Sequence, residues 1–475
     1  MTMRLTWAQP EDLVPHEIVQ SRAEGKNEQA LRNIEARWTQ AGGQLEPPVS
    51  GAGPVPATQS VRLLARELLT ELDALPPASH EHEPNEFEQI LALAPSARPT
   101  AVPDVASSEF RTRVAGAWLG RAAGCLLGKP VEKIPRTGIE AIARATGNWP
   151  LDGYFTAVGL PQEIAHKWPW NRRSAPTSLV ENIVCMPEDD DMNFPILGLA
   201  VVAEYGHDFT TEDIATAWLN NLPGGRVFTA ERAAYRNILD ARSAPETATH
   251  LNPFREWIGA LIRGDVFGWV NPGQVRHAAR QAWTDARLSH TRNGIYGEMW
   301  AAAAASAAVS VPVSSPQPHD IFDSIEHVLE LSLSVIPQDS QMAQAVRFGA
   351  RVGREEADLA AGLDRIHAQY GHLHWVHTLN NAAAGAFALT HSRGDYQKAI
   401  TAAVAAGWDT DSIGATVGGI VGGLLGSENL PHKWVAPLNG QVVTSIPGGS
   451  PRRFDDLISQ TIAHAARHHE TGEHA

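Results

Sequence analysis

The stretch VAGAWLGRAAGCLLG, residues 114–128, carries a glycine at every fourth position: Gly116, Gly120, Gly124 and Gly128. A second stretch, DTDSIGATVGGIVGGLLG at residues 409–426, repeats this spacing at Gly414, Gly418, Gly422 and Gly426. The spacing predicts two helices, each with a face that lacks side chains and lets another backbone approach closely. Each glycine lowers helix stability by up to about 1 kcal/mol relative to alanine, so we expect contacts that offset this loss. One interpretation is that these faces only pack closely in the core. The other is that this packing also holds together the groups at the helix ends, and the two interpretations are compatible.

Helical patterning continues over most of the chain. From about residue 106 onward, segments rich in alanine and leucine recur at helical spacing, whereas alternating strands bounded by turns are scarce. Helices are predicted in this part at residues 114–128, 194–206, 228–241, 274–287, 295–309, 321–334, 340–351, 374–390, 395–406 and 412–425. The pattern therefore predicts one large all-α domain over residues 106–475.

Residues 1–105 have a different character. Two helices are predicted at about 29–40 and 61–75, and proline-rich connectors separate them from each other and from the main domain. The connectors cover residues 47–56, 76–84 and 95–103. We interpret residues 1–105 as an N-terminal helical extension that packs on the main domain.

The composition excludes several classes of protein. The 475 residues carry a net charge of -15, and a chain that is 43% hydrophobic and 19% charged is not intrinsically disordered over most of its length. An acidic surface disfavours general nucleic-acid binding and adhesion to anionic membranes. The uncharged run 299–318 is broken by prolines, so it predicts a helix and a loop rather than a membrane span.

The location is predicted from the cysteines and the first residues. Cys125 and Cys185 do not make a disulfide framework, and a cysteine-ligated metal site would need more of them. The first residues, MTMRLTW, lack the apolar stretch of a signal peptide. We therefore expect a cytoplasmic protein.

Acidic residues stand directly before two of the predicted helices. Asp409 and Asp411 precede the second glycine stretch, and in a turn their carboxylates and the Ser412 hydroxyl could meet one hard cation. The run Glu188-Asp189-Asp190-Asp191 precedes an apolar helical segment. Solvated or capped helix N-termini are the alternative interpretation, but four adjacent carboxylates exceed what capping requires.

The composition of the two acidic clusters indicates the kind of ion. Neither cluster contains a cysteine or histidine, so the ligands are all oxygen, which suits Mg²⁺, Mn²⁺ or Ca²⁺ and argues against Zn²⁺. Five or six carboxylates would over-neutralise a single divalent ion but match two. The residues therefore favour a two-cation site.

The order of these motifs resembles that of the ADP-ribosylglycohydrolases, a family that includes the dinitrogenase-reductase-activating glycohydrolase. Residues 114–132, ending GKPVE, are similar to the family's glycine-rich first helix, which ends in a functional glutamate. The clusters at 188–191 and 409–412 stand where the family has Ser/Thr-Asp-Asp-Thr and Asp-x-Asp-Thr/Ser. Between them, residues 259–263 (GALIR) and the pair Ser289-His290 resemble two further family segments. The resemblance covers roughly residues 110–428.

The resemblance implies a compact orthogonal multi-helix bundle with two Mg²⁺ or Mn²⁺ ions at the mouth of a cleft. It implies that Glu132 and Asp190 are catalytic residues. The implied metal ligands are Glu188, Asp189, Asp190, Asp409, Asp411 and Ser412. Glu132 would act as a mobile ligand or an acid/base group. Two departures from the family pattern stand out, because Glu188 replaces a Ser/Thr and Asp191 replaces a Thr. Whether both of these residues bind metal is left open.

Five residues are candidates for substrate binding. Arg263 and His290 belong to segments that resemble the family, and the stretch that contains Asn381 either caps a helix or lines the substrate. Tyr296 could stack an adenine or simply pack in the core, and Trp408 could form an aromatic wall next to the aspartates. No nucleophile elbow, phosphate-binding Walker loop or dinucleotide fingerprint is present in the sequence.

The predicted function is a metal-dependent hydrolase that cleaves an ADP-ribosyl or a related N- or O-ribosyl bond. Its substrate would be a ribosylated small molecule or an ADP-ribosylated protein, with no nucleic-acid or membrane partner. The alternative is a catalytically silent protein that binds ADP-ribose or a nucleotide and keeps the fold and the ions. The presence of Glu132 and both aspartates of the Asp-x-Asp motif favours the enzyme.

Overall fold

The computed structural model describes residues 5–96 and 101–470. Helices α5 (Ser108–Gly128) and α21 (Thr410–Leu425) lie against each other along their glycine faces. A Cβ atom added at Gly120 would overlap the carbonyl oxygen of Gly418, and one added at Gly418 would overlap that of Gly120. The two backbones are therefore in direct contact, as the four-residue spacing predicts.

The all-α fold is confirmed. The helices before α5 are α1 (Pro10–Ala23), α2 (Glu28–Gln40), α3 (Gln59–Ala74) and α4 (Phe87–Ala92). Between α5 and α21 lie α6 (Arg136–Ala145), α7 (Gln162–Lys167), α8 (Ala175–Ser178), α9 (Asp190–Tyr205), α10 (Thr211–Asn221), α11 (Thr229–Leu239), α12 (Glu246–Thr249), α13 (Asp265–Trp269), α14 (Val275–Ala286), α15 (Asn293–Ala308), α16 (Pro318–Leu333), α17 (Gln341–Glu355), α18 (Leu359–Tyr370), α19 (Thr378–His391) and α20 (Tyr396–Ala405).

After α21 the chain forms α22 (His432–Val435) and α23 (Phe454–Glu470). Short 3₁₀ turns are η1 (Lys129–Val131), η2 (Gly224–Arg226), η3 (Leu261–Arg263), η4 (Ser427–Asn429) and η5 (Ala436–Leu438). The strands β1 (Gln441–Val442) and β2 (Arg452–Arg453) pair antiparallel and place Gln441 opposite Arg453.

Each helix predicted in the main part of the chain is present, with its ends shifted by a few residues, and α2 and α3 match the two N-terminal predictions. Other helices were not predicted, among them α1, α6, α10, α18 and α23. Of the predicted connector at 95–103, residues 97–100 lie outside the described part, as do residues 1–4 of the N-terminal stretch.

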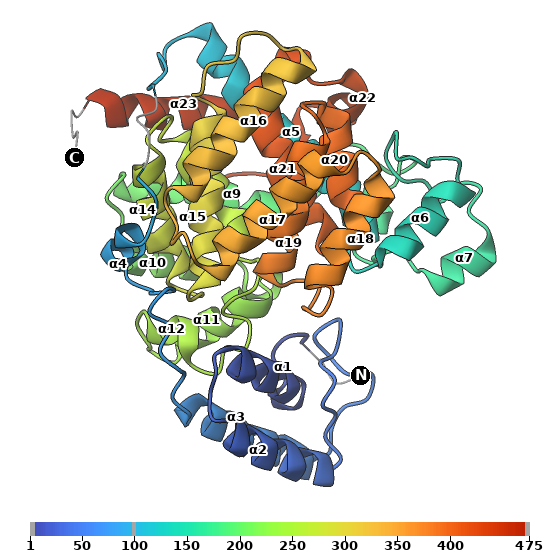
Figure 1. Ribbon diagram of the computed structural model, residues 1–475, viewed down its shortest axis with the longest axis vertical. Coiled ribbons are helices and arrows are strands. Elements are labelled where there is room, and N and C mark those ends of the chain that lie inside the picture. The colour runs from blue at the N-terminus through green and yellow to red at the C-terminus, as the bar shows by residue number, and fades with distance from the viewer. Residues whose placement is uncertain (1–4, 97–100, 471–475) are drawn as a thin grey trace.

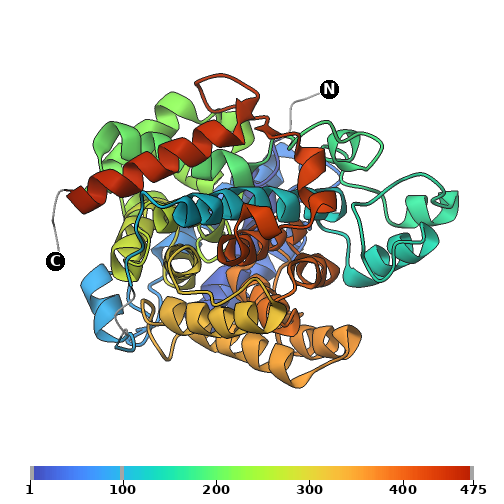
Figure 2. The same cartoon turned by 90° about the horizontal axis from the view of Figure 1, so that it is seen from above.

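Helix α5 runs through the middle of the molecule, with α23 on one side and α16 and α17 on the other (Figure 2). Helix α15, from the uncharged run, is buried along its whole length, so this run forms part of the core. Within the described residues, no helix is both long enough and apolar enough to cross a membrane. Helices α6 and α7 project to one side of the bundle (Figure 1).

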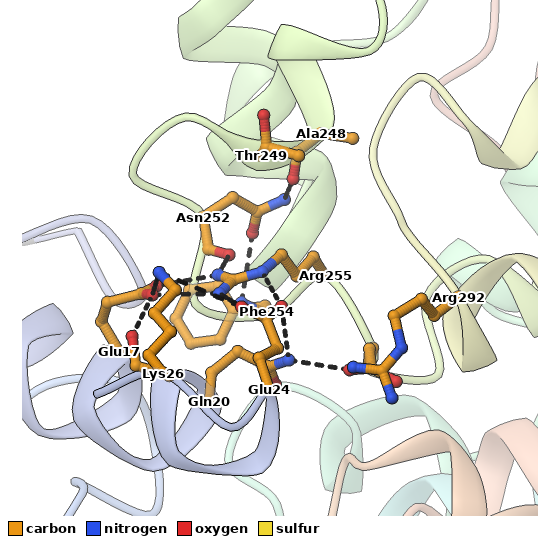
Figure 3. Close-up of polar contacts among 12 residues, drawn as sticks. Glu17, Gln20, Glu24, Lys26, Ala248, Thr249, Asn252, Phe254, Arg255 and Arg292 are labelled. Atoms are coloured by element: carbon orange, nitrogen blue, oxygen red, sulfur yellow. Dashed lines mark hydrogen bonds and ion pairs between the residues drawn. The ribbon is translucent and has the colours of Figure 1, made fainter. Parts of the chain in front are cut away.

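Helices α1, α2 and α3 form a layer below α11 and α12 (Figure 1). This layer is attached to the main part of the chain by a buried ionic network that centres on Arg255 (Figure 3). The Arg255 guanidinium donates to Glu17 at 2.9 Å and to Glu24 at 2.6 Å, and both carboxylates belong to the N-terminal segment. Lys26 Nζ lies 3.6 Å from Glu17 and 3.9 Å from Glu24, which adds a second buried cation.

An aromatic cluster lies next to this network. Trp7 and His16 from the N-terminal segment contact Phe254, Trp257 and His374, with ring centroids 5.3 to 6.0 Å apart. The Trp257 and His374 rings stack at 4.4 Å. The N-terminal extension is therefore joined to the rest of the chain by apolar as well as ionic contacts.

Replacement of Gly120 by alanine is expected to destabilise the protein by about 1–3 kcal/mol, because the new methyl group would force the α5 and α21 backbones apart. Gly385→Ala in α19 is the matched control. A Cβ there would meet Ile413 at 3.6 Å, an ordinary contact, so the higher helix propensity of alanine should leave stability unchanged or raised. Thermal melts that rank the two variants equally would contradict backbone contact at Gly120.

Candidate metal centre

Three chain segments meet at the candidate site: the end of α5 with η1, the start of α9 and the start of α21. The Thr410 hydroxyl donates to the Gly128 carbonyl oxygen at 2.8 Å, which fixes α21 against the end of α5. The Arg121 guanidinium on α5 donates to the Asp191 carbonyl oxygen at 2.9 and 3.0 Å, which fixes the start of α9. Helix α5 therefore positions both acidic clusters.

The two acidic clusters meet at Ser412. Its hydroxyl oxygen lies 3.2 Å from Asp191 Oδ2 and 3.1 Å from Asp409 Oδ1. Asp189 precedes α9 and its Oδ1 accepts from the Asp191 backbone N–H at 2.9 Å. A turn at Gly407 and Trp408, both with positive φ, precedes Asp409. Oxygen atoms from residues more than 200 positions apart in sequence thus form one group.

Repulsion between the carboxylates dominates the electrostatics of the group. Burial raises the pKa of Asp190 and Asp191 well above the ordinary range, and the charges of Asp189 and Asp411 raise them further. Burial and the charge of Glu132 raise the pKa of Asp411 to about 8. The carboxylates cannot all ionise at neutral pH unless additional positive charge enters the group.

The protein supplies part of that charge. Lys129 is buried, and its Nζ donates to the Glu188 carbonyl oxygen at 3.0 Å and to Asp189 Oδ2. Although burial alone would raise it, the ammonium group of Lys129 holds the pKa of Asp189 below its ordinary value. The Arg121 guanidinium also lies 3.5 Å from Asp191 Oδ1, but it is shared with Asp265 at 2.7 Å.

Glu132 borders the group on its exposed side. Its side chain retains 18% exposure, its Oε2 accepts from the Asn171 side-chain amide, and its Oε1 lies 3.4 Å from Lys133 Nζ. Its charge contributes to the raised pKa of Asp190, Asp409 and Asp411, which places it beside all three. A carboxylate in this position can reach both solvent and the acidic group.

The donor atoms fit a hard cation. Asp191 Oδ1 is buried without a hydrogen-bond donor, and the acidic group has more carboxylates than the nearby lysine and arginine can neutralise. A cysteine also lies in the group, since Cys125 Sγ and carboxylate oxygens of Asp189 and Asp191 lie within 4.8 Å of one another. The acidic clusters themselves contain no cysteine, and Cys125 joins them only in the fold. Burial and these two carboxylates raise the pKa of the Cys125 thiol, which disfavours the thiolate in the absence of a cation.

Comparison with known proteins identifies the family of the chain. The family described as ADP-ribosylglycohydrolase matches residues 106–469 of the chain. The chain belongs to the ADP-ribosylglycohydrolase family. A solved structure described as an ADP-ribosylglycohydrolase-related protein complex shares 18% sequence identity with a TM-score of 0.44, and the match covers 76% of this chain and 99% of that one. No curated protein matches the chain.

Membership in the ADP-ribosylglycohydrolase family implies a glycohydrolase, and the family acts on ADP-ribosylated substrates. The N-terminal extension lies outside the matched residues. Its attachment to the family domain is therefore a feature of this chain that the family match does not describe.

The Glu188 carboxylate has polar partners of its own within the protein. Its Oε2 lies 3.0 Å from the Arg226 guanidinium, and its Oε1 accepts from Asn193 at 3.3 Å. Asp191, which the predicted ligand set leaves out, instead contacts Ser412. The predicted metal contact of Glu188 stays a prediction. The contact of Asp191 with Ser412 makes Asp191 at least as good a candidate for a metal ligand.

Two of the predicted substrate residues lie beside the site. Asn381 Oδ1 accepts from the Asp409 backbone N–H at 3.2 Å, and its Nδ2 donates to the Trp375 and His377 carbonyl oxygens. Trp408 stacks on His367 at 4.1 Å and remains partly exposed. Asn381 positions the turn before α21, and the Trp408 ring of this turn is partly exposed to solvent.

The other three predicted substrate residues are buried in the core. Arg263 pairs with Glu231 at 2.8 Å and also contacts Asp285 and Glu298. His290 is buried next to Ser289, and the Tyr296 hydroxyl donates to the Pro84 carbonyl oxygen. The Arg263 guanidinium and the Tyr296 hydroxyl are used in contacts within the protein, whereas His290 Nε2 is buried without a hydrogen-bond partner. The substrate-binding role of these three residues stays a prediction.

Proposed function

We propose that this protein is a metal-dependent hydrolase that cleaves an ADP-ribosyl or a related N- or O-ribosyl bond at the acidic group. The observation that carries the proposal is the meeting of the two clusters at the Ser412 hydroxyl, which lies between Asp191 and Asp409. Family membership supports the reaction class. The buried carboxylates with raised pKa values support a requirement for cations.

Two Mg²⁺ or Mn²⁺ ions are the proposed cofactors. Their ligands would come from Asp189, Asp190, Asp409, Asp411 and Ser412, with Glu188 or Asp191 completing the set. When bound, such ions would hold the cis-diol of a ribose and lower the pKa of a water molecule. Oxygen donors of this kind match hard cations.

Glu132 and Asp190 are the proposed catalytic residues. Glu132 would hold or accept a proton at its carboxylate oxygens beside the anomeric carbon, while Asn171 and Lys133 keep that carboxylate in one orientation. Asp190 stays partly exposed between the charges of Asp189, Asp411 and Glu132. Its partial exposure suits a group that contacts a bound water.

Hydrolysis of a defined panel tests the proposal. The Mg²⁺-loaded protein should release ribose products from one or more of ADP-ribosylated arginine, ADP-ribosylated serine, nucleosides and nucleotides, and EDTA should abolish the release. Asp411→Asn should weaken metal binding by at least about 100-fold, because loss of groups outside the ligand shell already lowers affinity 10–100-fold.

Asp364→Asn, an exposed aspartate that pairs with Arg136, is the matched control and should retain both metal binding and turnover. A protein that binds ADP-ribose and metal but releases no product from any substrate would be the silent binding protein. Wild-type-like Mg²⁺ affinity in Asp411→Asn, measured by calorimetry, would contradict the metal centre itself.

A further inference from the structure

Two arginines lie against one aromatic ring beside the acidic group. Phe228 immediately precedes α11, and Arg232 lies one turn into that helix. The Arg232 guanidinium carbon lies 5.2 Å from the centroid of the Phe228 ring. Arg173, from the loop between α7 and α8, lies 5.3 Å from the same centroid. One half-buried ring therefore holds two guanidinium groups near each other.

Among the described residues, neither arginine has an acidic partner. Arg232 is 8% exposed, and its guanidinium donates to the carbonyl oxygen of Thr6 and lies 3.4 Å from the Thr6 hydroxyl, while its Nε is buried without any acceptor. Within residues 5–96 and 101–470, no carboxylate pairs with Arg232 or with the exposed Arg173.

The surroundings of Arg232 disfavour its charged form. Burial and the neighbouring charge of Arg173 lower the pKa of Arg232 to about 10. Buried arginines elsewhere in the chain have carboxylate partners, as Arg255 does with Glu17 and Glu24. Two like charges that are kept together without a counter-ion would be stabilised by an anion that contacts both.

Arg173 and the loop that leads to Phe228 are each linked to a residue of the candidate site. Arg173 donates its backbone N–H to Asn171 Oδ1 at 3.1 Å, and the Asn171 amide in turn donates to Glu132. On the other side, the loop that leads to Phe228 carries Arg226, which lies 3.0 Å from Glu188. Two residues span at most about 7 Å of chain, so Arg173 lies close to the predicted reaction centre.

We propose that Arg173 and Arg232, held against Phe228, bind a phosphate group of the substrate. This inference rests on the proposed function. The ribose of an ADP-ribosyl group carries a diphosphate on its exocyclic C5 carbon. Guanidinium groups bind phosphate oxygens through paired hydrogen bonds, and Arg173 is exposed enough to accept a ligand. The site favours phosphorylated ribosyl compounds over plain ribosides.

Binding of inorganic phosphate to the Mg²⁺-loaded protein tests the site without requiring turnover. Calorimetry should give an affinity at least about ten-fold weaker for Arg173→Gln than for wild type, because a charge-assisted hydrogen bond would be lost. Arg173→Lys should fall in between, since it keeps the charge but loses the planar donor pair. Arg173 is exposed, so these variants should fold normally.

The chain offers a matched control and a discriminating variant. Arg280 lies 5.3 Å from the centroid of Phe87 in the same kind of contact, so Arg280→Gln should leave phosphate affinity unchanged. Asp411→Asn, which removes a carboxylate of the metal centre, should also retain phosphate binding. If phosphate affinity falls in Asp411→Asn but not in Arg173→Gln, phosphate binds the metals and the proposal is wrong.

Competition identifies the source of the phosphate. ADP-ribose should displace inorganic phosphate, and its own affinity should fall at least about ten-fold in Arg173→Gln, whereas the affinity for ribose should not change. Simultaneous binding of ADP-ribose and phosphate would overturn the assignment to substrate. The protein could also bind phosphate through Arg173 but cleave no ribosyl bond. That result would support the anion site and contradict the proposed function.

Discussion

Glu132→Gln is expected to bind divalent ions and ADP-ribose almost normally and to turn over substrate at least about 100-fold more slowly. Asp189, Asp191, Asp409 and Asp411 are buried and would hold the proposed cations, so we expect retention of the ions to need little help from Glu132. The amide keeps the size and the contact with Asn171 but cannot accept a proton. A lost acid/base contribution is typically worth 10²–10⁴-fold, or about 3–5 kcal/mol of barrier.

The measurement is single-turnover product release, with metal content and ADP-ribose affinity determined on the same samples. Glu163→Gln is the matched control, because it makes the same change at an exposed glutamate on α7. This variant should match wild type in product release, metal content and ADP-ribose affinity. If Glu132→Gln retains turnover within a few-fold, Glu132 takes no part in the chemistry. If it also loses its metal, Glu132 is a ligand rather than an acid/base group.

Arg255→Met is expected to lower the free energy of unfolding by about 3–5 kcal/mol, because it leaves two buried carboxylates with too little positive charge. Lys26 would remain, but its Nζ lies farther from both glutamates than the guanidinium does. Methionine fills a similar volume, so most of the loss would come from charge rather than from a cavity.

Arg37→Met is the matched control, since Arg37 also pairs with two glutamates, Glu67 and Glu71, but is 40% exposed. A surface pair of this kind is worth at most about 1 kcal/mol, so denaturant unfolding should separate the two variants clearly. Equal midpoints would mean that the buried network adds no more stability than a surface pair.

The pH dependence supplies a second readout for Arg255. Burial would raise the pKa of Glu24, but Arg255 holds it at about 2, below its ordinary 4.5. The stabilisation from this pairing is present above pH 4.5 and is lost as the pH falls through that value toward 2. The stability gap between wild type and Arg255→Met should therefore narrow over this range.

The sequence predicts those features of the fold that depend on apolar periodicity. The glycine spacing of α5 and α21 is sufficient to predict that their backbones meet, and the apolar segments of α9 and α15 are sufficient to predict buried helices. Helix α1 was missed because its buried residues mix apolar side chains with charged and polar ones: beside Leu13, Val14 and Ile18 it buries Glu11, Asp12, His16, Glu17 and Gln20. A helix that packs partly through ion pairs shows no continuous apolar stripe in its sequence.

The candidate site was predicted only in part. The acidic clusters are visible because each precedes a helix, but their partners are distant in sequence and carry no signal of their own. Cys125 and Lys129 are four residues apart on α5 and η1, so the helical repeat could have placed them on one face next to Glu132. Arg263 and His290 were expected at the substrate, but no sequence pattern revealed that Glu231, Asp285 and Glu298 would surround the arginine in the core.

The attachment of the N-terminal extension has an evolutionary consequence. Arg255, Trp257 and Arg292 of the family domain are paired or covered by residues 7–83. In a descendant that lost the extension, the Trp257 ring and the guanidinium groups of Arg255 and Arg292 would become exposed to solvent. Loss of the extension would therefore have to coincide with substitutions at these three positions, so the two parts should be inherited and lost together among relatives.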